Sequence, residues 1–233
     1  NSNYIPVSKI LDEKAYVNGI VGLMATGGST NLLIHLIAMA RASGIIIDWS
    51  DFVEISKVIP LLAKVYPNGL ADVNHFHAAG GLGLVITELL GANLLHSDTQ
   101  TIMGNGLEAY TKEPKIIDGE LDWHSGASSS LNSKIISTTL DPFQETGGLA
   151  DLNGNLGSAV MKVSAVEISR RKITAPVRVF NDQESVLKAF RDGEFINDVI
   201  IAVRYQGPRA NGMPELHNLT PCMSVLQTRG LNV

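Results

Sequence analysis

The chain has very little cysteine, no excess of positive charge and no long apolar run. Its single cysteine, Cys222, excludes a disulfide within the chain and any metal site that needs several of the chain's own cysteines. The net charge of −5 argues against a general nucleic-acid binder, which carries a basic face. No apolar segment reaches the roughly 20 residues that a membrane span needs, so we expect no contact with a membrane and a cytoplasmic location.

The first half of the chain is predicted to be mostly helical. Residues 31–43 are apolar nearly all round, which predicts a helix buried on every side. Ser50 is a candidate N-cap for a helix over residues 51–58. Two further helices are expected on either side of Gly80 and Gly81, and residues 61–66 are predicted to form a buried strand.

After this half, the residue pattern changes. Residues 112–133 are polar and contain Asp118-Gly119, which suggests a boundary or linker. Short β-rich segments follow, with one helix predicted between Gln183 and Arg191. The expected strands lie at residues 135–140, 160–166, 177–180 and 199–203. We therefore predict an α/β fold, with a helix-rich α/β part over residues 1–125 followed by the start of a β-barrel-like domain over residues 126–233.

Near the end of the chain lies a turn punctuated by glycine and proline, residues 205–217. It follows a predicted strand and precedes a predicted helix over residues 216–226, so Glu215 is expected near a helix start. A carboxylate there is favoured by the helix dipole, by roughly 0.3–1 kcal/mol. Loops of this kind also carry ligand contacts, and a plain helix acid is the simpler alternative.

A second turn, Gly27-Gly28, is followed by Ser29, Thr30 and Asn31. Free backbone N–H groups at a helix start attract anions, so these three residues form a candidate site for an anion or a hydroxyl group. The alternative is an ordinary helix cap, and the sequence does not separate the two.

Together these motifs resemble the dihydroxy-acid dehydratase / 6-phosphogluconate dehydratase family. The resemblance is carried by GGSTN at residues 27–31 and GPRANGMPE at residues 207–215, with supporting stretches at residues 66–76 and 152–157. These segments keep the family's order and spacing over essentially the whole chain. The segments PNG at residues 67–69 and NGMPE at residues 211–215 resemble the phosphogluconate branch of the family.

The resemblance implies a chemistry. Family members dehydrate sugar acids, and this branch converts 6-phospho-D-gluconate to 2-dehydro-3-deoxy-6-phosphogluconate and water in the Entner–Doudoroff pathway. It implies an iron–sulfur cluster, expected as [4Fe–4S], together with Mg²⁺ and a serine base. The cluster cysteines and the serine are absent from this chain, which we therefore expect to be the middle portion of a longer, homodimeric enzyme. By resemblance, Glu215 is a Mg²⁺ ligand.

Four further residues surround Glu215 in the sequence and are candidates to bind a carboxylate or phosphate: Arg204, Arg209, Asn211 and His217. An acidic protein that binds a doubly anionic sugar needs such local positive charge, although exposed arginines are often only solvated. His75 and His77 are two residues apart, a spacing that suits a strand and favours no metal site. Cys222 is expected to be a buried, inert thiol.

Two other functions are also compatible with the sequence. One is a sister dehydratase that acts on an unphosphorylated sugar acid or on a 2,3-dihydroxy acid. The other is a non-catalytic module that binds sugar acids and keeps the fold without the cluster. Substrate preference separates the first from the phosphogluconate branch, and the presence of a cluster excludes the second.

Overall fold

The computed structural model describes residues 4–212 and 215–233. It divides into two compact units, Asn1–Ala165 (unit 1) and Val166–Val233 (unit 2), and each unit has its own hydrophobic core. Both units combine helices with small sheets, so the predicted α/β class is confirmed in broad terms.

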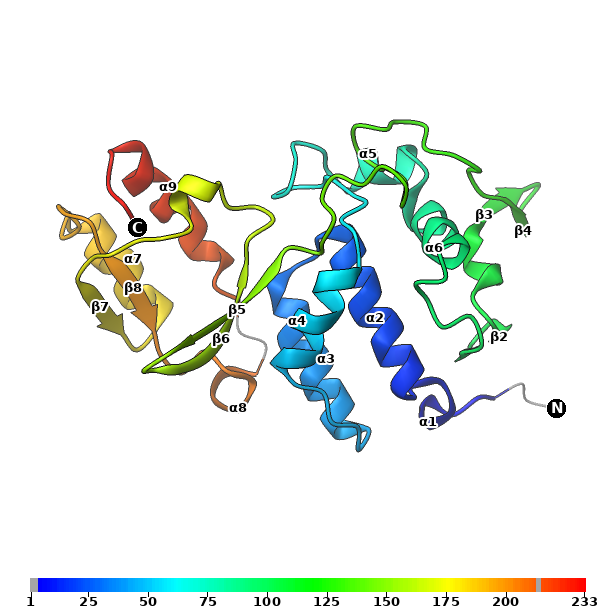
Figure 1. Ribbon diagram of the computed structural model, residues 1–233, viewed down its shortest axis with the longest axis horizontal. Helices are drawn as coiled ribbons and strands as arrows, with labels where there is room; N and C mark the ends of the chain where they lie inside the picture. The colour runs from blue at the N-terminus through cyan, green and yellow to red at the C-terminus, as the bar shows by residue number, and fades with distance from the viewer. Residues whose placement is uncertain (1–3, 213–214) are drawn as a thin grey trace. The chain divides into compact units, whose positions relative to one another are not determined.

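Over the described residues, unit 1 begins with six helices, so the mostly helical character predicted for this half is confirmed. Four of them, α3 to α6, match predicted helices, whereas α1 and α2 were not predicted individually. Figure 1 shows three of them, α2, α3 and α4, lying side by side. The last two helices are separated at Ala79 and Gly80, close to the predicted break, and Gly81 is already the first residue of α6. The helices are α1 (Val7–Ile10), α2 (Glu13–Thr26), α3 (Thr30–Ala42), α4 (Trp49–Val58), α5 (Val73–Ala78) and α6 (Gly81–Gly91).

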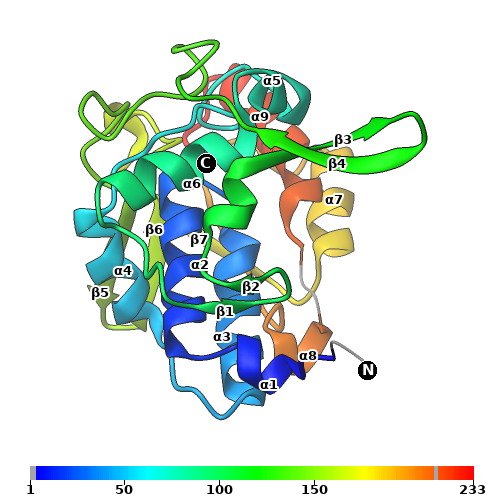
Figure 2. The ribbon, with the colours of Figure 1, turned by 90° about the vertical axis from the view of Figure 1, so that its right-hand side faces the viewer.

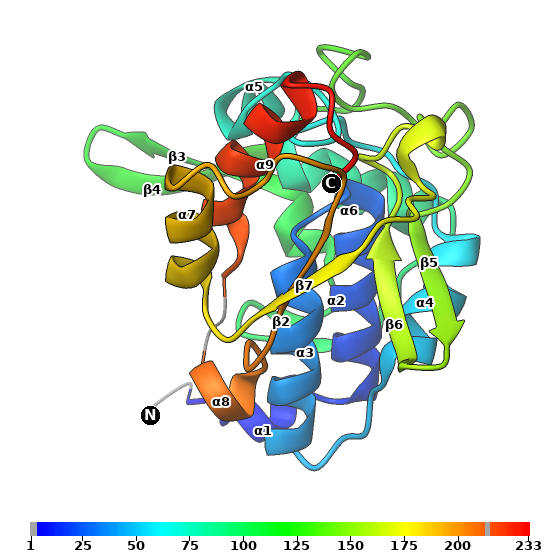
Figure 3. The same ribbon diagram turned by 90° about the vertical axis from the view of Figure 1, so that its left-hand side faces the viewer.

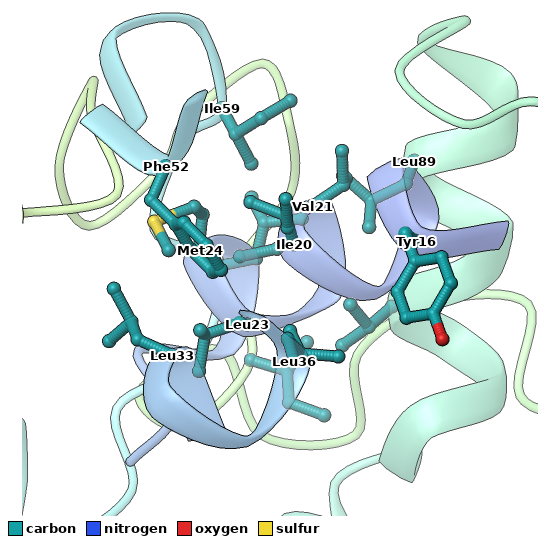
Figure 4. Close-up of a cluster of buried hydrophobic side chains, with 14 of the residues drawn as sticks. Tyr16, Ile20, Val21, Leu23, Met24, Leu33, Leu36, Phe52, Ile59 and Leu89 are labelled. Carbon is teal, nitrogen blue, oxygen red and sulfur yellow. The ribbon is translucent and has the colours of Figure 1, made fainter. Parts of the chain in front are cut away.

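Helix α2 lies at the centre of the core of unit 1. Its side chains Ile20 and Met24 are almost completely buried. Figure 4 shows them among Leu36 of α3, Phe52 of α4 and Leu89 of α6. Burying one such side chain contributes about 1.5–3 kcal/mol, so the neighbouring helices are held mainly through their contacts with α2.

The helix starts and faces differ from the prediction in two ways. α3 is not buried all round, because Leu32 and Met39 are exposed and only its other face packs against the core. α4 is capped by Asp48 rather than Ser50, since the Asp48 carboxylate accepts hydrogen bonds from both the backbone N–H and the hydroxyl of Ser50. Asp51 completes a capping box by accepting the Asp48 N–H at 2.9 Å.

Two predicted strands of unit 1, at residues 61–66 and 135–140, are wrong. Both segments contribute only isolated bridges, such as the one between Ala63 and Ile136. Leu62 and Ala63 donate their N–H groups to the carbonyl of Ala25 at the end of α2, so they are not free to extend a ladder. The first segment is nevertheless buried, as expected, at Leu61, Leu62 and Ala63.

The polar stretch predicted as a linker is partly ordered as a hairpin. Strands β3 (Lys112–Ile117) and β4 (Glu120–Ser125) pair antiparallel across a two-residue turn. Asp118 and Gly119 both have positive φ, which a tight hairpin turn requires and which Asp-Gly adopts readily. Figure 2 shows this hairpin extending away from α6. A shorter pair, β1 (Gln100–Thr101) and β2 (Gly104–Asn105), and the 3₁₀ helix η1 (Glu108–Thr111) precede it.

A second hairpin completes unit 1 and packs against α4 (Figure 3). Its strands are β5 (Leu149–Gly154) and β6 (Gly157–Lys162). The fully buried Ser56 of α4 ties the hairpin down, because its hydroxyl accepts the N–H of Leu149 at 3.0 Å and its carbonyl accepts that of Gly147 at 2.8 Å. Strand β6 lies a few residues earlier than predicted, since the N–H groups of Val163 and Ser164 turn to the Gly148 carbonyl.

Unit 2 is a small βαβ unit with further helices. Strands β7 (Val177–Phe180) and β8 (Ile200–Val203) run parallel and are connected through α7 (Gln183–Arg191). These strands and this helix confirm the sequence prediction. The predicted helix at 216–226 begins as a 3₁₀ turn and becomes α-helical at Thr220. The remaining elements are η2 (Ile168–Arg170), α8 (Pro208–Asn211), η3 (His217–Leu219) and α9 (Thr220–Thr228).

Within the described residues every sheet has two strands and none closes into a barrel. The predicted barrel-like domain is therefore not seen in this part of the protein. Nor does any helix in the described ranges combine the length and apolar character needed to cross a membrane.

Candidate functional site

The candidate residues fall on both units. Ser29, Thr30 and Asn31 lie at the start of α3 in unit 1, and the others lie in unit 2 around the loop that follows β8. Each group is built by its own unit, through the contacts described below.

The turn over residues 27–31 ends one helix and starts the next. Gly27 has φ of 57° and caps α2, with its N–H on the carbonyls of Leu23 and Met24. Ser29 then caps α3, because its hydroxyl accepts the N–H of Asn31 at 3.2 Å. The capping role that the sequence left open for Ser29 is therefore present.

Two side chains from distant parts of the sequence hold the carbonyls of this turn. The Lys162 ammonium donates to the Gly27 carbonyl at 2.5 Å and to the Gly28 carbonyl at 2.9 Å. Asn68 Nδ2 also donates to the Gly27 carbonyl, at 2.8 Å. The sequence predicted neither residue for the site. Asn68 belongs to the PNG segment that carries part of the family resemblance. Lys162 lay in a predicted strand and belonged to no motif.

Lys162 lies in a small, mostly apolar pocket. Leu23, Met24, Leu33 and Leu149 line it together with the turn itself. Burial among these side chains lowers the pKa of the Lys162 ammonium below its ordinary value of 10.5.

Gly27 is required by this packing. A Cβ atom at this position would lie 2.3 Å from Asn68 Nδ2 and 2.9 Å from a Leu61 methyl group. The left-handed backbone at Gly27 adds to the cost of any side chain there.

In unit 2, Arg204 is held at the carboxyl edge of the parallel strands. Asn181 follows β7 and Arg204 follows β8, so the two lie at the same edge of the sheet. Arg204 Nε and Nη2 both donate to Asn181 Oδ1, at 3.0 and 2.5 Å. Its guanidinium also lies 5.2 Å from the ring centroid of Tyr205, which has a positive φ of 61°. Ligands commonly bind at this edge of α/β sheets.

Glu215 is held by two neighbours. Its carboxylate lies 3.1 Å from Nδ1 of His217, and both side chains are exposed. Gln183, at the first turn of α7, donates from Nε2 to the main-chain carbonyl of Glu215 at 2.8 Å. Gln183 was not predicted as a residue of the site, and it belongs to none of the motifs. The expected helix start beside Glu215 is wrong, because α9 begins only at Thr220 and the intervening turn is 3₁₀.

Arg209 and Asn211 lie in the short helix α8, and both are exposed. Asn211 Nδ2 donates to Gln206 Oε1 at 3.2 Å, within the same loop. Residues 213 and 214, the Met-Pro of the motif, lie outside the described residues.

No group of three or more His, Cys, Asp or Glu side chains able to hold a metal ion occurs among the residues described. His75 and His77 lie in helix α5 rather than in a strand, and His75 bonds to Asp72, the cap of that helix. Cys222 is buried and donates to the Leu219 carbonyl at 2.9 Å, and burial raises its pKa. The predicted burial of this thiol is confirmed.

Comparison with known proteins agrees with these motifs. Residues 1–110 match the family model "Dihydroxy-acid/6-phosphogluconate dehydratase N-terminal", and residues 134–233 match the corresponding C-terminal model. The chain is 53% identical to a phosphogluconate dehydratase of Pseudomonas aeruginosa over 233 residues, and 53% identical to that of Escherichia coli K12 over 228 residues. It is 34% identical over 230 residues to a dihydroxy-acid dehydratase of Caldanaerobacter subterraneus.

These alignments cover 98–100% of the chain and 38% of each relative, so the chain spans less than half the length of the curated relatives it matches. The N-terminal and C-terminal family models match in that order and together cover most of the chain, including the Gly-Gly-Ser-Thr-Asn turn and the loop around Glu215. The chain therefore belongs to the dihydroxy-acid/6-phosphogluconate dehydratase family.

Proposed function

We propose that the protein carrying this chain is a hydro-lyase that converts 6-phospho-D-gluconate to 2-dehydro-3-deoxy-6-phosphogluconate and water. The observation that carries the proposal is the 53% identity to phosphogluconate dehydratases along the whole chain. The lower identity of 34% to a dihydroxy-acid dehydratase favours the phosphorylated substrate over a branched dihydroxy acid. The reaction belongs to the Entner–Doudoroff pathway.

In this reaction a proton leaves C2 of the sugar acid and the hydroxyl group leaves C3. The resulting enol becomes the 2-keto acid, so one water is lost and no electrons are exchanged with another molecule. The substrate carries a carboxylate and a phosphate. The task of this chain's residues is therefore to bind two anionic groups and to orient C2 and C3.

Unit 2 supplies cationic and polar groups for one anionic end. Arg204 is pre-oriented by Asn181, which reduces the entropy lost when it binds a ligand. Arg209, Asn211 and His217 are exposed in or beside the same loop. We assign these residues to substrate binding, with Arg204 as the principal contact because its planar guanidinium suits a phosphate or carboxylate.

Unit 1 supplies backbone N–H groups at the start of α3. Ser29 Oγ satisfies the N–H of Asn31, while the N–H groups of Ser29 and Thr30 have no acceptor among the described residues. Such groups attract an anion or a hydroxyl oxygen. We therefore keep Ser29, Thr30 and Asn31 as substrate-binding residues.

The family's iron–sulfur cluster does not fit the residues of this chain. The only cysteine, Cys222, is buried and hydrogen-bonded to a carbonyl, and its pKa is raised, whereas a cluster ligand must be a thiolate. A cluster, which we expect to be [4Fe–4S], would be held by residues outside these 233.

Glu215 fits a role as one Mg²⁺ ligand. Its carboxylate is exposed, His217 is its one side-chain partner among the described residues, and Mg²⁺ in proteins often takes only one or two carboxylates. When bound, Mg²⁺ would neutralise negative charge on the substrate. The remaining ligands would come from water, from substrate or from other parts of the protein.

Two properties of the whole protein stay predictions from the resemblance. One is that residues 1–125 end a cluster-bearing α/β domain and residues 126–233 begin a swivelling β-barrel domain, to which other strands would have to be added. The other is that the protein is a cytoplasmic homodimer.

The test is anaerobic dehydratase activity of the full-length protein on 6-phosphogluconate, gluconate and 2,3-dihydroxyisovalerate. A strong preference for 6-phosphogluconate is the expected result. Preference for either other acid would make the protein a sister dehydratase. Absence of activity on all three from a protein that holds its cluster would contradict the proposal.

A further inference from the structure

We propose that Lys162 is a positioning residue for the substrate-binding turn of unit 1. Its ammonium aligns the peptide units of Gly27 and Gly28 so that the N–H groups at the start of α3 are presented to an anionic or hydroxyl group of the sugar acid. The inference rests on the proposed function for the identity of the ligand. The positioning itself rests on the contacts of unit 1.

Lys162 fixes the direction of the peptide group between Gly28 and Ser29. Lys162 Nζ lies 2.9 Å from the Gly28 carbonyl oxygen. In a planar trans peptide the N–H points opposite to the C=O. The Ser29 N–H of this peptide unit is therefore turned away from Lys162. It has no acceptor among the described residues, which leaves it available to a ligand.

The charge of Lys162 has a reason in its contacts. Lys162 donates to two consecutive carbonyls, and the pocket around it contains mainly apolar side chains rather than a carboxylate. Burying an ammonium group in such surroundings is costly, and methionine would fill the same space without that cost. The charge is therefore explained by the two carbonyls that it orients.

Lys162 is itself held in place by the fold of unit 1. Lys162 ends strand β6, whose hairpin is tied to α4 through the two hydrogen bonds of Ser56. From a second segment, Asn68 donates to the same Gly27 carbonyl. The turn is thus held by two residues that lie far apart in the sequence.

The experiment uses Lys162→Met in the full-length protein, with Lys162→Arg as the conservative variant. Lys64→Met is the matched control. Lys64 is also partly buried in unit 1, but its ammonium lies over the Phe143 ring at 4.5 Å and does not contact the turn. Two quantities are measured: amide hydrogen exchange of peptides covering residues 27–34, and KM and kcat for 6-phosphogluconate.

We expect faster amide exchange at the turn in Lys162→Met. We also expect KM to rise about tenfold while kcat changes by less than about twofold. This pattern indicates that binding of the substrate and of the transition state is weakened equally. Lys162→Arg, which keeps the charge and the donors, should recover part of the KM, and Lys64→Met should leave both quantities near wild type.

Unchanged exchange in Lys162→Met would overturn the positioning role, whatever the substrate. Faster exchange with an unchanged KM would overturn the link to substrate binding. If the wild-type protein does not dehydrate 6-phosphogluconate, the proposed function fails, while the exchange comparison still decides whether Lys162 orders the turn.

Discussion

The turn at residues 27–31 and the loop at residues 204–217 carry the two most distinctive motifs of the chain, and they differ in which of their groups are fixed by the fold. The carbonyls of the turn are fixed by Asn68 and Lys162, which are 41 and 135 residues away from Gly27. The loop carries exposed side chains, of which Glu215 and Asn211 contact neighbours within the loop, while Arg204 bonds to Asn181, 23 residues away.

This difference separates the two elements that we propose to bind the substrate. The turn presents backbone N–H groups, which have fixed directions once the fold is formed. The loop presents long charged side chains, which remain accessible and lose rotamer freedom when they bind. We therefore expect substitutions in the turn to act on stability and geometry, and substitutions in the loop to act on activity with the fold unchanged.

The largest expected effect is that of Glu215→Gln in the full-length protein. If Glu215 is the Mg²⁺ ligand that we propose, removing its charge should lower kcat by about 100-fold or more, as the loss of one electrostatic contact does in other enzymes. Thermal unfolding should stay close to wild type, because the carboxylate is exposed. Glu184→Gln, also an exposed glutamate of unit 2, is the control and should keep its activity. Near-normal turnover of Glu215→Gln would remove this residue from the site.

Next in size is Gly27→Ala, compared with Gly44→Ala. Both glycines have positive φ, but a Cβ at Gly27 meets Asn68 and Leu61, whereas a Cβ at Gly44 meets nothing within 4 Å. Left-handed strain costs about 1–2 kcal/mol at either site, and overpacking adds roughly 1–3 kcal/mol at Gly27 alone. Urea unfolding of both variants measures the difference. Equal losses of stability would show that the turn is not tightly packed.

A smaller effect is expected for Arg204→Met. Losing a hydrogen-bonded cation should raise KM for 6-phosphogluconate by about tenfold, as hydrogen bonds to charged groups are worth roughly 1.5–3 kcal/mol. Arg191→Met is the control, since Arg191 is an exposed arginine of the same unit paired with Glu184. Steady-state kinetics on both variants would decide, and an equal rise in KM for the two would point to a general charge effect instead.

The smallest effect concerns pH. Burial lowers the pKa of Lys162 in the folded protein below its ordinary value of 10.5, so between these two pKa values the unfolded chain binds more protons than the folded one. Stability from this group therefore rises with pH through that window and is lowest below it. The free energy of unfolding of wild type relative to Lys162→Met should increase as pH approaches 10.5. A constant difference across this range would contradict the pKa shift.

Sequence reasoning was most accurate where the signal is local. Helix α7 matches its predicted range, because Asp182 caps it and its apolar residues recur at helical spacing. The predictions were wrong where the partner of a backbone group decides the structure. Residues 61–66 look like a strand, yet Leu62 and Ala63 bond to Ala25 at the end of α2. The polar stretch over residues 112–133, predicted as a boundary or linker, contains a hairpin closed by Asp118 and Gly119, a local feature that the sequence analysis did not predict.

The sequence by itself determined the family, through the GGSTN turn and the loop around Glu215, and it determined helix α7 with the strands β7 and β8 on either side of it. These features depend on residue identity and local spacing alone. Only the tertiary structure placed Lys162 and Asn68 on the turn and Gln183 on Glu215. Contacts of this kind join segments far apart along the chain, and a hydrogen bond between a side chain and a distant carbonyl leaves no periodic pattern in the sequence.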